Sequence, residues 1–75
     1  MKAGYLLEAK DHKRVTDLDG RQFIVPKGTT LFCTSVVRMP AILGRGERTE
    51  LTLYDAVRDS LFTTHPHWLK IISKN

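Results

Sequence analysis

The chain has 75 residues, of which 41% are hydrophobic and 27% charged, so it is too apolar for a disordered protein and too short for two domains. Twelve Lys and Arg against eight Asp and Glu give a formal charge of +4, which suits a phosphate backbone or an acidic protein surface. No apolar run is long enough for a membrane span or typical of a signal peptide. We predict one domain over residues 1–75, and the lone Cys33 favours the cytoplasm.

The first part of the chain alternates short apolar runs with turn signals. Residues 3–9 predict an opening strand, and the charged residues 10–14 predict an exposed loop. A brief strand at residues 15–16 precedes residues 17–20, where Asp-Gly stands between extended runs. Because Asp and Gly both tolerate positive φ, this dipeptide predicts a hairpin turn.

Residues 21–37, RQFIVPKGTTLFCTSVV, hold the densest run of β-branched and aromatic residues. Pro presets the first position of a type I turn and Gly tolerates the left-handed region, so residues 26–28 predict a bulged turn. We therefore expect a hairpin on which the other elements assemble. Its second strand alternates apolar and polar positions, which predicts one face formed by Leu31, Cys33, Ser35 and Val37.

Residues 50–64 admit two interpretations. Alternation over residues 50–56, a turn at 58–60 and an extended run at 61–64 predict a second hairpin. Thr52-x-x-Asp55 would also serve as the capping box of a helix. We predict the hairpin.

The end of the chain predicts one helical turn and a closing strand. Pro66 fits the first position of a short helix, and residues 68–73 predict the last strand. The sequence thus predicts an all-β fold, a small five-stranded barrel whose closure removes exposed edges. The long loop at 39–49 and the helical turn before the last strand resemble the SH3-like small barrels as a class. That resemblance implies a fold and no particular function.

The sequence predicts no catalytic residue, metal site or cofactor. Cys33 lies in mid-strand, in phase with Leu31, which is typical of a small buried hydrophobe and not of a nucleophile. His65 and His67 form one close pair, whereas a structural zinc site normally shows two such pairs. We expect a non-catalytic protein.

Basic residues concentrate in two segments, the loop at residues 10–14 and the surroundings of the long loop at 39–49, and they support a nucleic-acid interface. If both segments project from one end of the fold, they form one positive surface, on which exposed Tyr5, Tyr54 or Trp68 could stack on bases. The interleaved acidic residues are equally typical of an ordinary solvated surface. The candidate phosphate-contacting residues are Lys10, Lys13, Arg14, Arg21, Arg38, Arg45 and Arg48.

The loop at residues 39–48 supports an alternative, a protein-binding anchor. Apolar side chains among arginines are typical of interface hot spots, and long irregular loops often carry function. The chain would then be a small phage-type adaptor or inhibitor that docks on a larger host complex. We expect nucleic acid or such a complex as partner, no membrane, and no particular oligomeric state. The candidate docking residues are Met39, Ile42, Leu43, Arg45 and Arg48.

Overall fold

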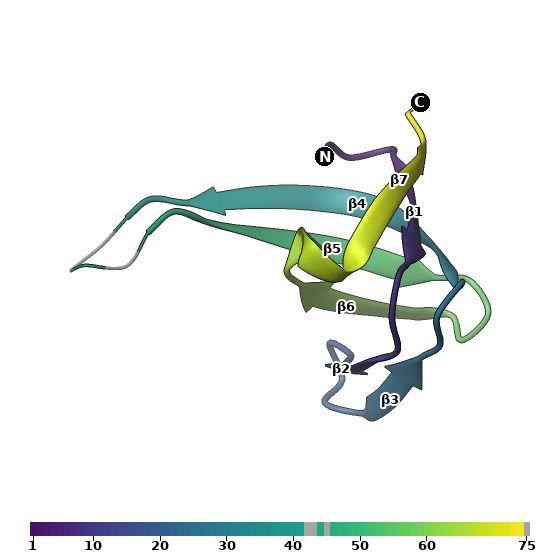
Figure 1. Ribbon diagram of the computed structural model, residues 1–75. Helices are drawn as coiled ribbons and strands as arrows, with labels where there is room; N and C mark the ends of the chain where they lie inside the picture. The colour runs from purple at the N-terminus through teal and green to yellow at the C-terminus, as the bar shows by residue number, and fades with distance from the viewer. Residues whose placement is uncertain (42–43, 45, 75) are drawn as a thin grey trace.

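The computed structural model describes residues 1–41, 44 and 46–74, and over this part of the chain it is all-β, as predicted (Figure 1). No helix among these residues is long and apolar enough to cross a membrane. The described elements are β1 (Leu6–Ala9), β2 (Lys13–Thr16), β3 (Gln22–Val25), β4 (Thr30–Met39), β5 (Arg48–Asp55), β6 (Ser60–Thr64), the 3-10 helix η1 (Pro66–Trp68) and β7 (Leu69–Ser73).

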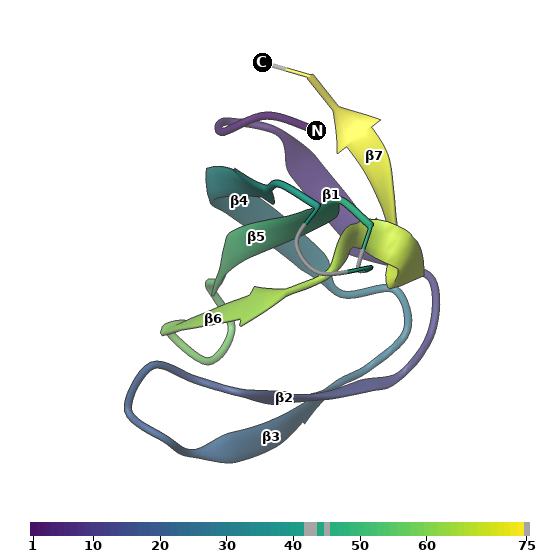
Figure 2. The same ribbon diagram turned by 90° about the vertical axis from the view of Figure 1, so that its left-hand side faces the viewer.

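The strands form two antiparallel sheets. The larger sheet has the order β6-β5-β4-β1-β7, and β2 pairs with β3 in a separate hairpin. An isolated bridge between Asp17 and Phe62 joins the hairpin to β6, where the amide of Leu18 also donates to the carbonyl of Leu61 at 3.0 Å. The β2–β3 hairpin lies beside β6, below the larger sheet in both views (Figures 1 and 2).

The predicted hairpin over residues 21–37 is wrong. β3 pairs with β2, whereas β4 pairs with β1 and β5, so the two halves of this stretch belong to different sheets. The turn itself is present, because the amide of Thr29 donates to the carbonyl of Pro26 at 3.2 Å and Gly28 has φ 91°. The Gly28 amide, however, donates to the carbonyl of Ala9 at the end of β1. The turn therefore transfers the chain from one sheet to the other.

Three other boundaries differ from the predictions. The opening strand begins at Leu6 and not at residue 3, and residues 13–14 belong to β2 and not to a loop. The described chain has seven strands where the prediction had five. The segment at 39–49 is shorter than expected, since Met39 pairs with Arg48.

The second predicted hairpin is confirmed. β5 and β6 pair in register from Leu51–Thr64 to Asp55–Ser60, so the helical alternative is wrong. The predicted helical turn before the last strand is also present as η1, with Pro66 in its first turn. Pro suits this position because its missing N–H would have no helical partner there.

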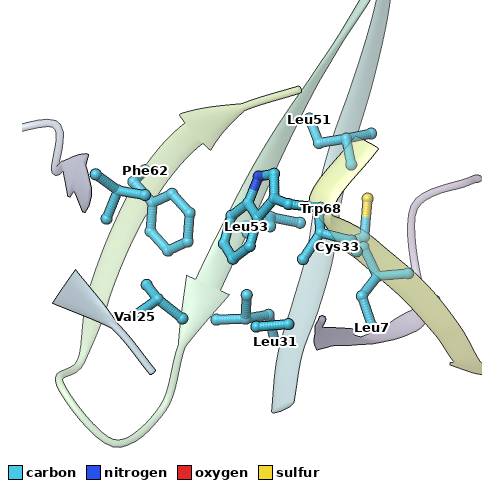
Figure 3. Packing of buried hydrophobic residues seen from close by; sticks show 11 residues of the cluster. Leu7, Val25, Leu31, Cys33, Leu51, Leu53, Phe62 and Trp68 are labelled. Carbon is cyan, nitrogen blue, oxygen red and sulfur yellow. The ribbon is translucent and has the colours of Figure 1, made fainter. Parts of the chain in front are cut away.

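Buried side chains from both sheets form one hydrophobic core (Figure 3). Phe62 is fully buried in it, packed edge-on against Phe23 with ring centroids 5.7 Å apart and stacked on Trp68 at 6.5 Å. Cys33 is fully buried among leucines, as predicted. The buried apolar residues are Leu7, Ala9, Val15, Val25, Leu31, Cys33, Leu51, Leu53, Phe62, Trp68 and Leu69.

A β-bulge in β4 changes which side chains face this core. Thr34 and Ser35 together lie opposite Thr52, because the register shifts between Cys33 and Ser35. An extra residue reverses the alternation of a strand. Val36 therefore packs against the core, and Val37, predicted to share a face with Cys33, is 49% exposed.

Candidate functional site

The β4–β5 hairpin extends past the rest of the larger sheet as a two-stranded arm, which we define as residues 37–41 and 46–50. β1 pairs with β4 only over Thr30–Phe32, and β6 pairs with β5 only over Leu51–Asp55. Within the arm, β4 and β5 therefore pair with each other alone in the described residues, from Val37–Glu50 to Met39–Arg48. Figure 1 shows the arm reaching away from the body of the protein. The candidate residues Ile42, Leu43 and Arg45 lie outside the described residues.

The arm carries an arginine on each face. Side chains of successive pairs in an antiparallel ladder alternate between the two faces. Arg38, opposite Thr49, is therefore on one face, and Arg48, opposite Met39, is on the other. Both arginines are exposed, and neither is in the ion pairs found in the described part of the chain. Their guanidinium groups are free to contact an external anion.

Two more candidate residues lie at the base of the arm. Lys13 and Arg14 of β2 line a hollow of about 290 Å³ between β2 and the end of β6. Glu50 and His65 line the same hollow, and Arg48 lies two residues before Glu50 on the same side of β5. The hollow therefore lies between the basic residues of β2 and the arm, and the Glu50 carboxylate is part of its lining.

Lys10 and Arg21 lie elsewhere. Both are exposed, but Lys10 precedes β2 and Arg21 precedes β3, so they are at opposite ends of the β2–β3 hairpin. The amide of Lys10 donates to the carbonyl of Trp68 at 2.8 Å, and the amide of Arg21 donates to Oδ1 of Asp17 at 2.8 Å. The structure therefore brings Lys13 and Arg14 to the base of the arm, whereas Lys10 and Arg21 lie apart from the arm.

The aromatic residues proposed to stack on bases are mostly unavailable. Trp68 is buried, and its Nε1–H donates to Oγ1 of Thr64 at 2.8 Å. Tyr5 packs against the core. Tyr54 is half-buried on the outer face of the larger sheet, beside Phe32, which is 39% exposed. Phe32 was not predicted as a site residue, although its place between buried Leu31 and Cys33 puts it on the opposite face of β4.

The described histidines and the cysteine form no metal cluster. The rings of His65 and His67 stack with centroids 6.3 Å apart, and Nδ1 of His65 lies 3.3 Å from the carbonyl oxygen of Thr49. Within residues 1–41, 44 and 46–74, no three His, Cys, Asp or Glu side chains gather as metal ligands would. Burial raises the pKa of the Cys33 thiol, whose Sγ donates to the carbonyl of Ser35. A buried, protonated thiol is a poor nucleophile.

The candidate site is thus an exposed arm with an arginine on each face and a basic hollow at its base. Its chemistry is that of anion contact, through guanidinium and ammonium groups. Comparison of the chain with known protein families, curated proteins and solved structures finds no match.

Proposed function

We propose that this protein is a non-catalytic binding module that associates with double-stranded nucleic acid through its arm. The observation that carries the proposal is the projection of a two-stranded ribbon with unpaired Arg38 and Arg48 on opposite faces. The major groove of B-form DNA, about 12 Å wide, admits a two-stranded β-ribbon. In that position, arginines on both faces of a ribbon can reach the phosphates on the two sides of the groove.

The hollow at the base of the arm would extend this contact. Lys13 and Arg14 lie where a phosphate backbone entering beside the arm would pass. Glu50 lines the same hollow and Glu47 lies in the arm, so these carboxylates oppose the attraction. We therefore propose modest affinity, dominated by phosphate contacts and with little base specificity.

The proposal is tested by fluorescence anisotropy with a labelled 20-base-pair DNA duplex and with the corresponding RNA duplex. Counterion release predicts that the logarithm of the association constant falls linearly with the logarithm of salt concentration, with a slope of about −0.9 for each phosphate contacted. The titration should run from roughly 50 to 200 mM salt, the range over which phosphate contacts weaken strongly. Absence of salt-sensitive binding to either duplex at low ionic strength would contradict the proposal.

A second function, docking of the arm on a larger protein complex as an adaptor or inhibitor, has support of its own. Val37 and Met39 lie on the same face of the arm as Arg48, and Val37 is half exposed. Apolar side chains beside an arginine are typical of protein-binding anchors. The triple change Met39→Ser, Ile42→Ser and Leu43→Ser should abolish such docking without unfolding the protein. A nuclease-treated pull-down separates the two functions, because only a protein partner survives digestion.

We also infer that the two sheets together form a small barrel of the SH3-like class. The bridge from Asp17, just after β2, to Phe62 of β6 and the hydrogen bond from the amide of Lys10, before β2, to the carbonyl of Trp68 support closure of the barrel. The single buried thiol, Cys33, supports a role in the reducing cytoplasm. Slow amide exchange along the β2–β6 seam, measured by NMR, would support the closed barrel, and fast exchange would favour two separate sheets.

A further inference from the structure

The outer face of the larger sheet carries a continuous apolar row. In register, Leu6 of β1 lies opposite Phe32 of β4, Phe32 lies opposite Tyr54 of β5, and Tyr54 lies opposite Leu61 of β6. Leu18 extends the row, since its amide donates to the carbonyl of Leu61. With strands about 4.8 Å apart, five such positions span about 19 Å. We name Leu6, Phe32, Tyr54, Leu61 and Leu18 the outer row.

The outer row is exposed to solvent along much of its length. Leu18 is 64% exposed, Phe32 and Leu61 are each more than a third exposed, and Leu6 and Tyr54 are half-buried. Isolated exposed apolar side chains are common, but a contiguous apolar patch on a small protein is typical of an interaction surface.

One end of the outer row opens into an acidic hollow. The hollow has a volume of about 300 Å³ and is lined by the outer-row residues Leu18, Tyr54 and Leu61, and by Ser60. Three carboxylates complete its lining, and no Lys or Arg is among the described residues that line it. These carboxylates are Asp17, Asp19 and Asp59.

The carboxylates of Asp17 and Asp59 are held by hydrogen bonds, and no ion pair found in the described part of the chain neutralises any of the three. Oδ1 of Asp17 accepts the amides of Asp19 and Arg21, at 2.9 and 2.8 Å. Oδ1 of Asp59 accepts the phenol of Tyr54 at 2.6 Å. Neither the ion pair of Arg58 nor that of Lys70, the two found in the described part of the chain, involves these three groups. Their negative charge therefore faces the hollow.

We propose that the outer face docks a segment of a partner protein that combines apolar side chains with a Lys or Arg. The apolar side chains would cover Leu6, Phe32 and Tyr54. The basic side chain would enter the hollow, with its aliphatic stem against Leu18 and Leu61 and its cationic head among the carboxylates. A basic partner fits this surface because its positive charge complements the three carboxylates at the acidic end of the row.

This surface is separate from the arm and does not depend on the proposed nucleic-acid contact. The acidic hollow repels phosphate, so nucleic acid and anionic lipid headgroups are the wrong ligands for it. Leu6, Phe32, Tyr54 and Leu61 lie on strand segments that pair within the body of the larger sheet, away from the arm's described pairs, and Leu18 lies in the turn between β2 and β3. A protein docked here would leave the arm free.

The test uses a displayed library of random twelve-residue peptides, selected on the full-length protein. A parallel selection uses the double variant Asp19→Asn, Asp59→Asn, which keeps the turn because Asn tolerates the positive φ of 51° at position 59. Peptides enriched on the wild type but not on the variant are expected to carry Lys or Arg beside apolar residues. One such peptide, titrated into ¹⁵N-labelled protein, should shift the amides of Phe32, Tyr54 and Leu61.

Affinity measurements with that peptide separate the two parts of the surface. Losing two exposed charge pairs should weaken binding about three- to tenfold in the Asp19→Asn, Asp59→Asn variant. Replacing the row, Phe32→Thr with Leu61→Thr, should weaken binding at least about tenfold, as truncation of two apolar anchors does. Val57→Thr is the matched control, because Val57 is 84% exposed but lies in the β5–β6 turn outside the row. It should leave the affinity unchanged.

Four outcomes would overturn the proposal. Selections on the wild type and the charge variant could yield the same peptides, or the enriched peptides could lack basic residues. The amide shifts could map to the arm or to the edges of the sheet. Light scattering could show a dimer that Phe32→Thr with Leu61→Thr dissociates, in which case a second copy of this chain occupies the face.

Discussion

Asp55 and Arg58 form an ion pair at the start of the β5–β6 turn, with Nη1 of Arg58 donating to Oδ2 of Asp55 at 2.7 Å. The Asp55 side chain is 0% exposed, and its Oδ1 accepts the amide of Val57 at 3.0 Å. The guanidinium of Arg58 also lies 5.4 Å from the ring centroid of Phe23 in β3. One buried carboxylate thereby organises the turn and links it to the β2–β3 hairpin.

Replacing Asp55 should be among the most destabilising changes in the chain. Asp55→Ala leaves turn amides and a guanidinium without their acceptor, which should lower the free energy of unfolding by about 3 kcal/mol. Asp55→Asn keeps one carbonyl acceptor and should cost about half as much, since only the charge-assisted contact is weakened. Urea denaturation followed by the fluorescence of the single Trp68 measures both variants. Equal stability of Asp55→Ala and the wild type would show that the carboxylate does not organise the turn.

The thiol of Cys33 should be unreactive in the folded protein. Burial raises its pKa, so the thiolate forms only at more alkaline pH than in an exposed cysteine. An aromatic disulfide reagent should therefore react slowly with the native protein and rapidly in denaturant. Fast reaction under native conditions would contradict the burial of this side chain.

The same pKa shift predicts a loss of stability at alkaline pH. A raised folded-state pKa means that the folded protein holds its thiol proton more tightly than the unfolded chain does. The resulting stabilisation is complete below the unfolded thiol pKa of about 8.5 and is lost as pH rises through the folded pKa. Cys33→Ala removes this contribution, so its stability should fall less than that of the wild type between pH 7 and about 10. Parallel urea titrations of both proteins across that range would reveal the difference.

Tyr54 should titrate at higher pH than an isolated tyrosine. Its hydroxyl donates to the Asp59 carboxylate at 2.6 Å, and this hydrogen bond, reinforced by desolvation and by the negative charges of Asp59 and Asp55, raises the pKa of the phenol. Ultraviolet titration of a Tyr5→Phe variant isolates the signal of Tyr54. Adding Asp59→Asn should move the midpoint to lower pH, and an unchanged midpoint would exclude the hydrogen bond as the cause.

The local turns of this fold could be predicted from the sequence. Asp-Gly at residues 19–20 closes the β2–β3 hairpin, where Gly20 has φ 87°. Pro66 begins the 3-10 turn before β7. Both signals act within four residues, so no distant contact had to be known.

The partners of the longer strands could not be predicted in the same way. Pro26–Gly28 does form a turn, but β1, far away in sequence, supplies the partner of the Gly28 amide and pairs with β4. Exposure also depends on such distant pairing. Trp68, one of three aromatic residues considered for base stacking, is buried against Phe62 and Thr64 of β6. Phe32 is left outside because no element covers that face among the described residues.

The arm's arginines should control the salt dependence of nucleic-acid binding. Arg38→Gln with Arg48→Gln removes two phosphate-contacting groups, so the salt slope should become about two units shallower. Affinity for the duplex at low salt should fall at the same time. Fluorescence anisotropy at several salt concentrations measures both quantities on one sample series.

Lys2→Gln with Lys74→Gln is the matched control for this pair. It removes the same net charge, but Lys2 precedes β1 and Lys74 follows β7, so neither lysine belongs to the arm. The control should leave the salt slope unchanged. Equal effects of the two double variants would show that net charge, and not the arm, governs binding.

The bulge in β4 makes opposite predictions for two adjacent valines. Val36 packs against the core, whereas Val37 is exposed on the arm. Val36→Asp places a carboxylate against apolar side chains and should lower the free energy of unfolding by about 2 to 3 kcal/mol. Val37→Asp should change it by no more than about 0.5 kcal/mol, as is usual for an exposed position.

Urea denaturation of both variants decides between the bulged strand and uninterrupted alternation. Continued alternation from Leu31 and Cys33 would bury Val37 and expose Val36, so the order of the two effects would reverse. Val37→Asp also adds a negative charge beside Arg38 and Arg48, so it should weaken duplex binding while the fold remains intact. A stable Val37→Asp variant with unchanged duplex affinity would show that the arm does not bind the duplex.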